Sequence, residues 1–181
     1  CNDTICKILE LVNKYEEPDL IRFRYKKVPN GYEQYKYMEE QDVKITKADF
    51  KEKVYPMFLN GYMLNALWTN CIKKEVWENT KILIDNINYG EDLIQNLEIF
   101  SNINNVVFSN DVLYQYVLNE NSVTNTKSID KLLKNLEDAK KVYPLLYTYL
   151  IKWDMYDSTN IDIVRKRVEK ETNQIVEITA Q

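Results

Sequence analysis

The order of hydrophobic and polar residues changes period twice within the first fifty positions. Residues 3–17 carry apolar side chains three and four positions apart, which predicts a helix that ends before Pro18. Over 20–28 the period is two, because apolar and basic residues alternate, as expected for a half-buried strand. The apolar set is Ile21, Phe23 and Tyr25, and the basic set is Arg22, Arg24 and Lys26.

The strand over 20–28 leads into a turn signal. Pro29 is followed by Asn30-Gly31, and residues 32–38 form a second extended run. Asn-Gly between two such runs is the strongest short-range hairpin signal, because both residues accept positive φ. We therefore expect a β-hairpin over about 20–38. A short strand over 174–179 would then be placed to pair with it.

Helical periodicity dominates the rest of the chain. Thr46 with Asp49 resembles an N-terminal cap for a helix that Pro56 interrupts. The regular spacing of apolar residues over 61–87 predicts the clearest helix. Gly90 could adopt the left-handed conformation that often ends a helix. Further helices are expected over 91–100 and from Asn110 to Val117.

The C-terminal third is expected to hold two long helices. Residues 119–127 are polar and are predicted to form the main loop. Ser128 is then a suitable cap for a helix that is bent or restarted at Pro144 and runs to Trp153. Asp157 and Ser158 are positioned to cap the last helix.

These elements together predict a mainly α fold. With 3 glycines and 4 prolines the chain has few of the residues that form the tight turns between the strands of a β-sandwich. We expect one helical bundle-like domain over 1–181, with a hairpin at about 20–38 and a helical core at about 46–170. A chain of this length can bury a core without disulfides or metals.

The composition excludes several kinds of chemistry. Histidine is absent, which removes serine and cysteine triads of the usual type and histidine-bound metals. The glycines are too few for a phosphate-binding loop. We therefore expect no catalytic residue, no metal site and no cofactor. The excess of Asn, Ile, Lys and Tyr is typical of AT-rich genomes, as in viruses, phages, low-GC bacteria or protozoan parasites.

Acidic clusters leave one enzymatic alternative open. The clusters are Glu39 with Glu40 and Asp42, Glu91 with Asp92, and Glu137 with Asp138. Convergent carboxylates could hold a hard cation or perform acid–base hydrolysis. No spacing among them forces convergence, so solvated and helix-capping roles are favoured over a carboxylate-based, metal-dependent enzyme.

The hairpin supplies the candidate binding residues. On a strand, Arg22, Arg24 and Lys26 would project roughly 6–7 Å apart from one face, which is close to the phosphate spacing of a nucleic acid. The tyrosines of the second run could stack on bases; they are Tyr32, Tyr35 and Tyr37. The favoured interpretation is an edge strand protected by its charges, because the net charge of −4 offers no general attraction to nucleic acid.

The leading functional hypothesis is therefore a non-catalytic protein–protein interaction or accessory module. Its positive support is the 14 tyrosines and 3 tryptophans, since both residue types are enriched at binding hot spots. Nucleic-acid binding through the basic hairpin is the alternative. The sequence contains no run of about 18 apolar residues, so no membrane span is expected. Cys1 could carry a lipid anchor, so a surface lipoprotein is the alternative to the favoured cytoplasmic location.

Overall fold

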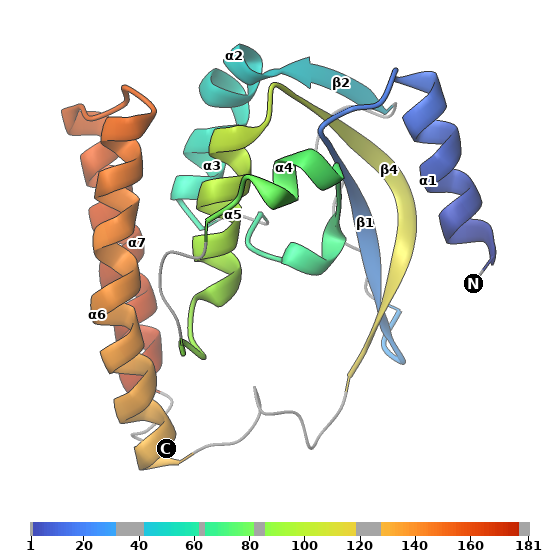
Figure 1. Cartoon of the computed structure of the whole chain (residues 1–181). Helices are drawn as coiled ribbons and strands as arrows, with labels where there is room; N and C mark the ends of the chain where they lie inside the picture. Colours follow the sequence, from blue (N-terminus) through green and yellow to red (C-terminus); the bar gives the residue numbers. More distant parts are fainter. Residues whose placement is uncertain (1, 32–41, 62–63, 82–85, 119–127, 178–181) are drawn as a thin grey trace.

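A mixed β-sheet lies at the centre of the protein. The computed structural model describes residues 2–31, 42–61, 64–81, 86–118 and 128–177. Within them the strand order is β2-β4-β1-β3 (Figure 1). The strands are β1 (Leu20–Val28), β2 (Val43–Thr46), β3 (Asn70–Ile72) and β4 (Asn105–Val117). The central pair, β1 and β4, is parallel, whereas β2 and β3 each pair antiparallel with one of them.

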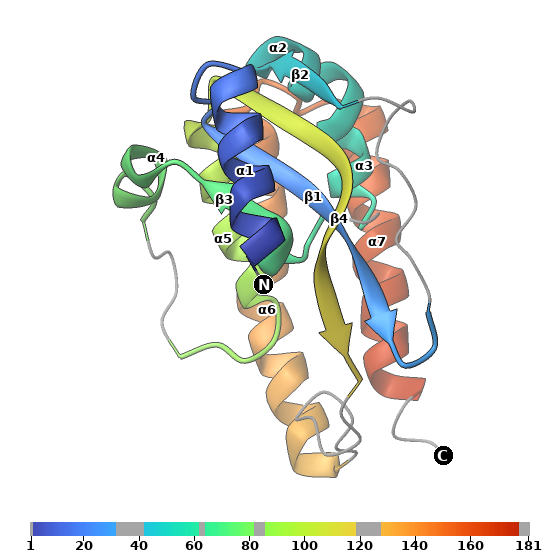
Figure 2. The same cartoon turned by 90° about the vertical axis from the view of Figure 1, so that its right-hand side faces the viewer.

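Helices cover both faces of the first half of this central pair. Helix α1 (Asn2–Lys14) lies on one face, where Leu11 packs with Ile21 and Val107 (Figure 2). The other face carries α3 (Tyr55–Leu59) and α5 (Glu91–Asn102), and the pair α6 (Ile129–Lys152) and α7 (Ser158–Glu177) lies beyond them (Figure 1). The sheet is therefore sandwiched between one helix and two successive helical layers.

The main core is aromatic. Phe50 packs between the sheet and the helices, with ring centroids 5.0 Å from Phe100, 6.5 Å from Phe108 and 6.1 Å from Trp153. Tyr55 stacks on Trp153 at 4.6 Å. Because these rings come from five different elements, one cluster ties the sheet to both helical layers.

Predicted helix caps are found where the sequence placed them. Thr46 begins a helical segment made of α2 (Lys47–Asp49), the π-helical turn Phe50–Val54 and α3, and its Oγ1 accepts a hydrogen bond from Asp49 N. Ser128 Oγ accepts from Lys131 N at 3.2 Å and begins α6. Asp157 Oδ1 accepts from two backbone N–H groups at the start of α7. These three predictions are confirmed.

The prediction of a mainly α, helical bundle-like fold with a small hairpin is wrong, because the sheet is four-stranded and mixed. The strand over 20–28 is confirmed as β1. The second arm of the predicted hairpin lies largely outside the described residues. The next described strand, β2, does not pair with β1, since β4 lies between them.

The long helix predicted over 61–87 is also wrong. The described part of this range contains a 3-10 turn η2 (Leu67–Thr69), strand β3 and the short helix α4 (Lys74–Glu78). Asn70 and Ala66 accept hydrogen bonds from the guanidinium of Arg22, and Cys71 pairs with Ile21 across the sheet. These long-range contacts outweigh the local helical pattern.

Two further predictions assigned the wrong type of secondary structure. The helix predicted from Asn110 to Val117 is the second half of β4, and residues 174–177, predicted as a strand, belong to α7. Gly90 does adopt a left-handed conformation (φ 85°), but it begins α5 instead of ending a preceding helix. A Cβ there would lie 3.0 Å from Val142 Cγ1, so glycine permits α5 to approach α6.

Candidate functional site

The second half of the central strand pair extends past α1 and forms the candidate site. We call this region the sheet end. It consists of residues 24–28 of β1, residues 111–117 of β4 with the following Leu118, and Trp68 of η2. Figures 1 and 2 both show β1 and β4 continuing beyond the N-terminal end of α1. The sheet end is therefore less covered than the first half of the sheet.

Register assigns the side chains of the sheet end to two faces. Tyr25 pairs with Tyr114 and Lys27 with Tyr116 in the parallel ladder. Paired residues point to the same side of a sheet and successive residues to opposite sides. One face therefore carries those four residues, while the opposite face carries Lys26, Gln115 and Val117.

Trp68 covers the aromatic face. Its ring centroid lies 4.8 Å from Tyr25, 4.7 Å from Tyr114 and 5.4 Å from Tyr116. The contact with Tyr25 is edge-on at 74°, whereas the contact with Tyr116 is stacked at 29°. Three tyrosines from two strands and one tryptophan from a turn therefore form a single interlocked cluster.

Large apolar side chains remain exposed at the end of β4, with Tyr114 on the aromatic face and Val117 on the opposite face. Val117 is 67% exposed, Leu118 43% and Tyr114 39%. These three lie within five consecutive positions, and Leu118 N donates to Val28 O at 2.9 Å, which holds the end of β4 beside β1. Exposed apolar residues grouped on a fixed backbone are typical of a binding surface.

A buried polar network holds the turn that carries Trp68. The Arg22 guanidinium, which is fully buried, donates to Asn70 Oδ1 at 2.8 Å and to Ala66 O at 3.3 Å. Asn70 Nδ2 in turn donates to Asn96 Oδ1 of α5 at 3.1 Å. Trp68 thus lies on a turn fixed to both β1 and α5.

Asp92 completes the support of this turn. Its Oδ2 accepts from Leu67 N at 3.3 Å. Burial raises the pKa of Asp92 above its ordinary value, and the hydrogen bond from Leu67 and the charge of Arg22 oppose that rise. A partly buried carboxylate and a buried guanidinium therefore stabilise each other beneath the aromatic cluster.

The three basic residues predicted to share a binding face have different surroundings. Arg22 is buried, so the expectation that it projects from the surface is wrong. Arg24 Nη1 donates to Asn110 O at 2.9 Å. Lys26 is half-buried on the face opposite Trp68. Tyr32, Tyr35 and Tyr37 lie outside the described residues.

Two of the clustered acids, Asp42 and Asp138, accept hydrogen bonds from backbone N–H groups of segments distant in sequence. Asp42 Oδ1 accepts from Asn110 N at 2.8 Å, and Asp138 Oδ2 accepts from Asn88 N and Tyr89 N. Within the described part of the chain, no three Asp, Glu or Cys side chains gather as a metal ion would require. Glu39 and Glu40 are not among the described residues.

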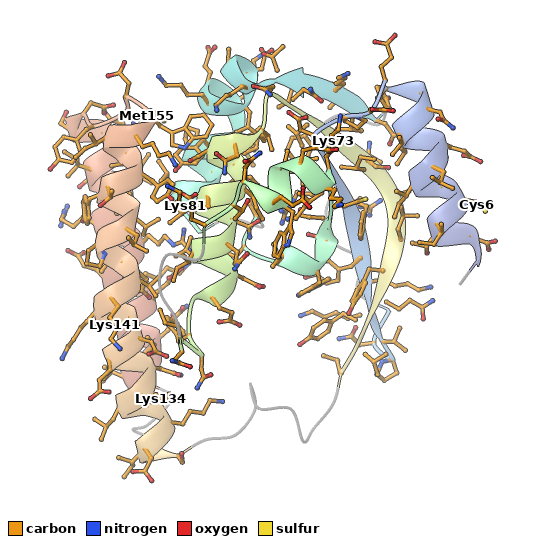
Figure 3. The ribbon with its side chains drawn as sticks, in the orientation of Figure 1. Cys6, Lys73, Lys81, Lys134, Lys141 and Met155 are labelled. Atoms are coloured by element: carbon orange, nitrogen blue, oxygen red, sulfur yellow. The ribbon has the colours of Figure 1, made fainter. Side chains whose placement is uncertain are left out.

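The two described cysteines have different surroundings. Cys6 lies on the outward side of α1, and Cys71 is half-buried in β3 beneath that helix (Figure 3). Burial raises the pKa of the Cys71 thiol. Cys1 is outside the described residues. No described helix combines the length and apolar composition needed to cross a bilayer.

The sequence analysis missed the residues that dominate the sheet end, namely Trp68, Tyr114, Tyr116, Val117 and Leu118. One signal was present: Val112, Tyr114 and Tyr116 alternate with other residues, which is the period of a strand. Trp68 gave no such signal, because its position depends on the Arg22 network.

Comparison with models of known protein families and with curated proteins found no match for this chain.

Proposed function

We propose that this chain is a non-catalytic interaction module that binds a protein partner through the sheet end. The observation that carries the proposal is the exposure of Tyr114, Val117 and Leu118 at the end of β4, where Tyr114 also belongs to the interlocked aromatic cluster. Hot spots in protein interfaces are enriched in tyrosine and tryptophan held in fixed positions. Here Trp68 and its tyrosine neighbours are fixed before any partner arrives.

Pre-organisation favours binding at this surface. An aromatic side chain that is already held loses little conformational entropy when a partner covers it. The network of Arg22, Asn70 and Asn96 supplies that rigidity from below. The sheet end therefore has the two features of a binding surface: apolar area and a fixed shape.

The experiment compares two variants that place the same charge at equally exposed positions. Val117→Asp changes the sheet end at a side chain that is 67% exposed, and Ile151→Asp changes α6 at one that is 64% exposed. We expect partner capture from the native source to fall at least tenfold for Val117→Asp and to be retained by Ile151→Asp. Thermal unfolding of both variants checks that neither has lost the fold. Equal capture by the two variants would refute the proposal.

A second candidate function is binding of single-stranded nucleic acid. The adjacent Lys26 and Lys27 favour it, because Lys27 shares a face with Tyr25 and Tyr116. Basic residues beside aromatic rings are the usual elements of such sites. The two candidates differ in the chemistry of the ligand.

A further inference from the structure

The second half of β4 has an edge with no neighbouring strand among the described residues. β2 pairs with β4 only over 105–108, and β1 lies along the other side of β4 (Figure 2). Leu118 N donates to Val28 O, and successive residues of a strand direct their backbone groups to opposite edges. The N–H and C=O groups of Gln115 and Val117 therefore point away from β1, and both side chains are exposed. We call residues 113–117 the outer edge of β4.

This outer edge lacks the features that keep an edge strand from pairing. Residues 112–118 contain no charged residue, no proline and no glycine. The irregularities in the β1–β4 register lie before Tyr25 and Tyr114, so the pairing over 114–117 is regular. By contrast, β3 has three residues, and β2 has four and carries the exposed Lys44. An uncharged, regular and exposed edge is expected to pair with a further strand.

The sequence of the outer edge is almost symmetrical about Gln115. Tyr114 and Tyr116 flank it, and Leu113 and Val117 lie one position further out. When two identical strands pair antiparallel about Gln115, each tyrosine faces a tyrosine and Leu113 faces Val117. Gln115 then faces its own copy. Each of these pairs joins side chains of the same type, and no charge is covered.

We infer that the partner of the sheet end is a second copy of this chain, paired antiparallel through the outer edge of β4 about a twofold axis at Gln115. The inference rests on the proposed function, because it names the partner of the same surface. Gln115 exchanges backbone hydrogen bonds with its own copy, and Val117 with Leu113. Leu113 O already accepts from Thr4 Oγ1 at 3.2 Å, and a carbonyl oxygen has the capacity for two hydrogen bonds.

The symmetry of residues 113–117 favours a second copy over an extended segment of another protein. A foreign strand would pair with any edge of suitable shape, whereas a twofold axis makes each residue meet its mirror position. The contact is small, at about five residues a side, so we expect the dimer to dissociate with a constant on the order of 10 µM.

The first test is sedimentation velocity over a concentration series. Gln115→Lys places two like charges opposite each other at the axis and should weaken dimerisation roughly fivefold or more. Gln174→Lys makes the same change at an exposed position of α7 and should leave dimerisation unchanged. Circular dichroism checks that both variants keep the fold. A wild-type dimer that Gln115→Lys leaves intact would overturn the inference, because its contact would lie elsewhere.

The second test locates the axis by oxidation of single cysteines, in a chain whose native cysteines are replaced by serine. Residues that face each other in a hydrogen-bonded antiparallel pair have Cα atoms about 5.5 Å apart, within the range of a disulfide. Gln115→Cys should therefore form a covalent dimer. Val117→Cys, which is equally accessible to the oxidant, faces Leu113 of the other copy and should not. Equal cross-linking of the two variants would overturn the pairing about Gln115.

The remaining outcomes separate the inference from the proposed function. A chain that stays monomeric at millimolar concentration, yet captures a different protein in a manner that Val117→Asp abolishes, would overturn the second copy and leave the interaction module standing. If the chain stays monomeric and no capture depends on Val117, both fail.

Discussion

Burial changes what a single residue can do in this protein, and Arg22 is the clearest case. In the alternating pattern of β1 it is indistinguishable from Arg24 and Lys26. In the fold its guanidinium is fully buried and binds Asn70 and Ala66 of a distant segment. Its role in the structure is to hold the turn that carries Trp68.

Replacement of Arg22 should therefore affect stability first. Arg22→Met removes the hydrogen bonds to Asn70 Oδ1 and Ala66 O, of which Ala66 O keeps the bond from Thr69 Oγ1, and it leaves the Asp92 carboxylate without its nearby positive charge. We expect the free energy of unfolding to fall by about 2–4 kcal/mol in urea titrations.

The matched control is Arg165→Met, on the exposed side of α7, which should leave the unfolding midpoint unchanged. An Arg22→Met variant that unfolds at the wild-type urea concentration would show that the buried network contributes nothing to stability.

The candidate site was only partly predictable from its residues. Tyr25 and Lys26 were recognised as part of a strand from local alternation, and that placement is correct. Their neighbours across the sheet could not be found in this way. Tyr114 and Tyr116 join the site because β4 pairs with β1 in parallel, and Trp68 joins it through contacts of Arg22.

At the scale of elements, helix starts were predicted well because a cap is a local interaction. The side chains of Thr46, Ser128 and Asp157 bind backbone N–H groups two or three residues ahead, so the sequence alone contains both partners. Strands β2, β3 and β4 were missed because their partners are distant in sequence.

The cap at α7 gives a prediction that depends on pH. Hydrogen bonds from Asn160 and Thr159 lower the pKa of Asp157 below its ordinary value of 3.8. A lowered carboxyl pKa means that the folded state favours the charged form, so this stabilisation is present above the ordinary pKa. It is lost as the pH falls through the lowered pKa of the folded state.

We therefore expect Asp157→Ala to be less stable than the wild type at neutral pH and to converge with it in strong acid. Ser128→Ala removes an uncharged cap and should cost about 1 kcal/mol at every pH. Thermal unfolding across a pH series measures both variants. A constant difference between Asp157→Ala and the wild type would contradict the role of the charge.

At the scale of the whole molecule, the two halves of the β1–β4 ladder differ in their surroundings. Residues 20–22 and 106–108 lie between α1 and the main core and are fully or almost fully buried. Residues 26–28 and 115–117 lie in the sheet end and are partly or fully exposed. Local stability should follow this difference, because buried contacts protect backbone hydrogen bonds from opening.

Hydrogen exchange measured by mass spectrometry should show that difference directly. Amides of residues 20–22 and 106–108 are expected to exchange among the slowest in the protein, and those of 115–117 considerably faster. Uniform protection along β4 would contradict the division of the sheet into two parts.

The sequence by itself determined the features that depend on near neighbours: the first helix, the strand over 20–28, the helix caps and the two long C-terminal helices. Only the tertiary structure decided the mixed sheet, because residues 61–87 and 110–117 satisfy a helical pattern locally. Their strands form because Cys71 pairs with Ile21 and Tyr114 pairs with Tyr25, which lie some 50 and 90 residues away in the sequence. The same long-range pairing buries Arg22 and brings Trp68 over the tyrosines. The site is thus a product of the sheet: the alternation of Tyr114 and Tyr116 indicates a strand locally, but only the pairing of β4 with β1 places them beside Tyr25.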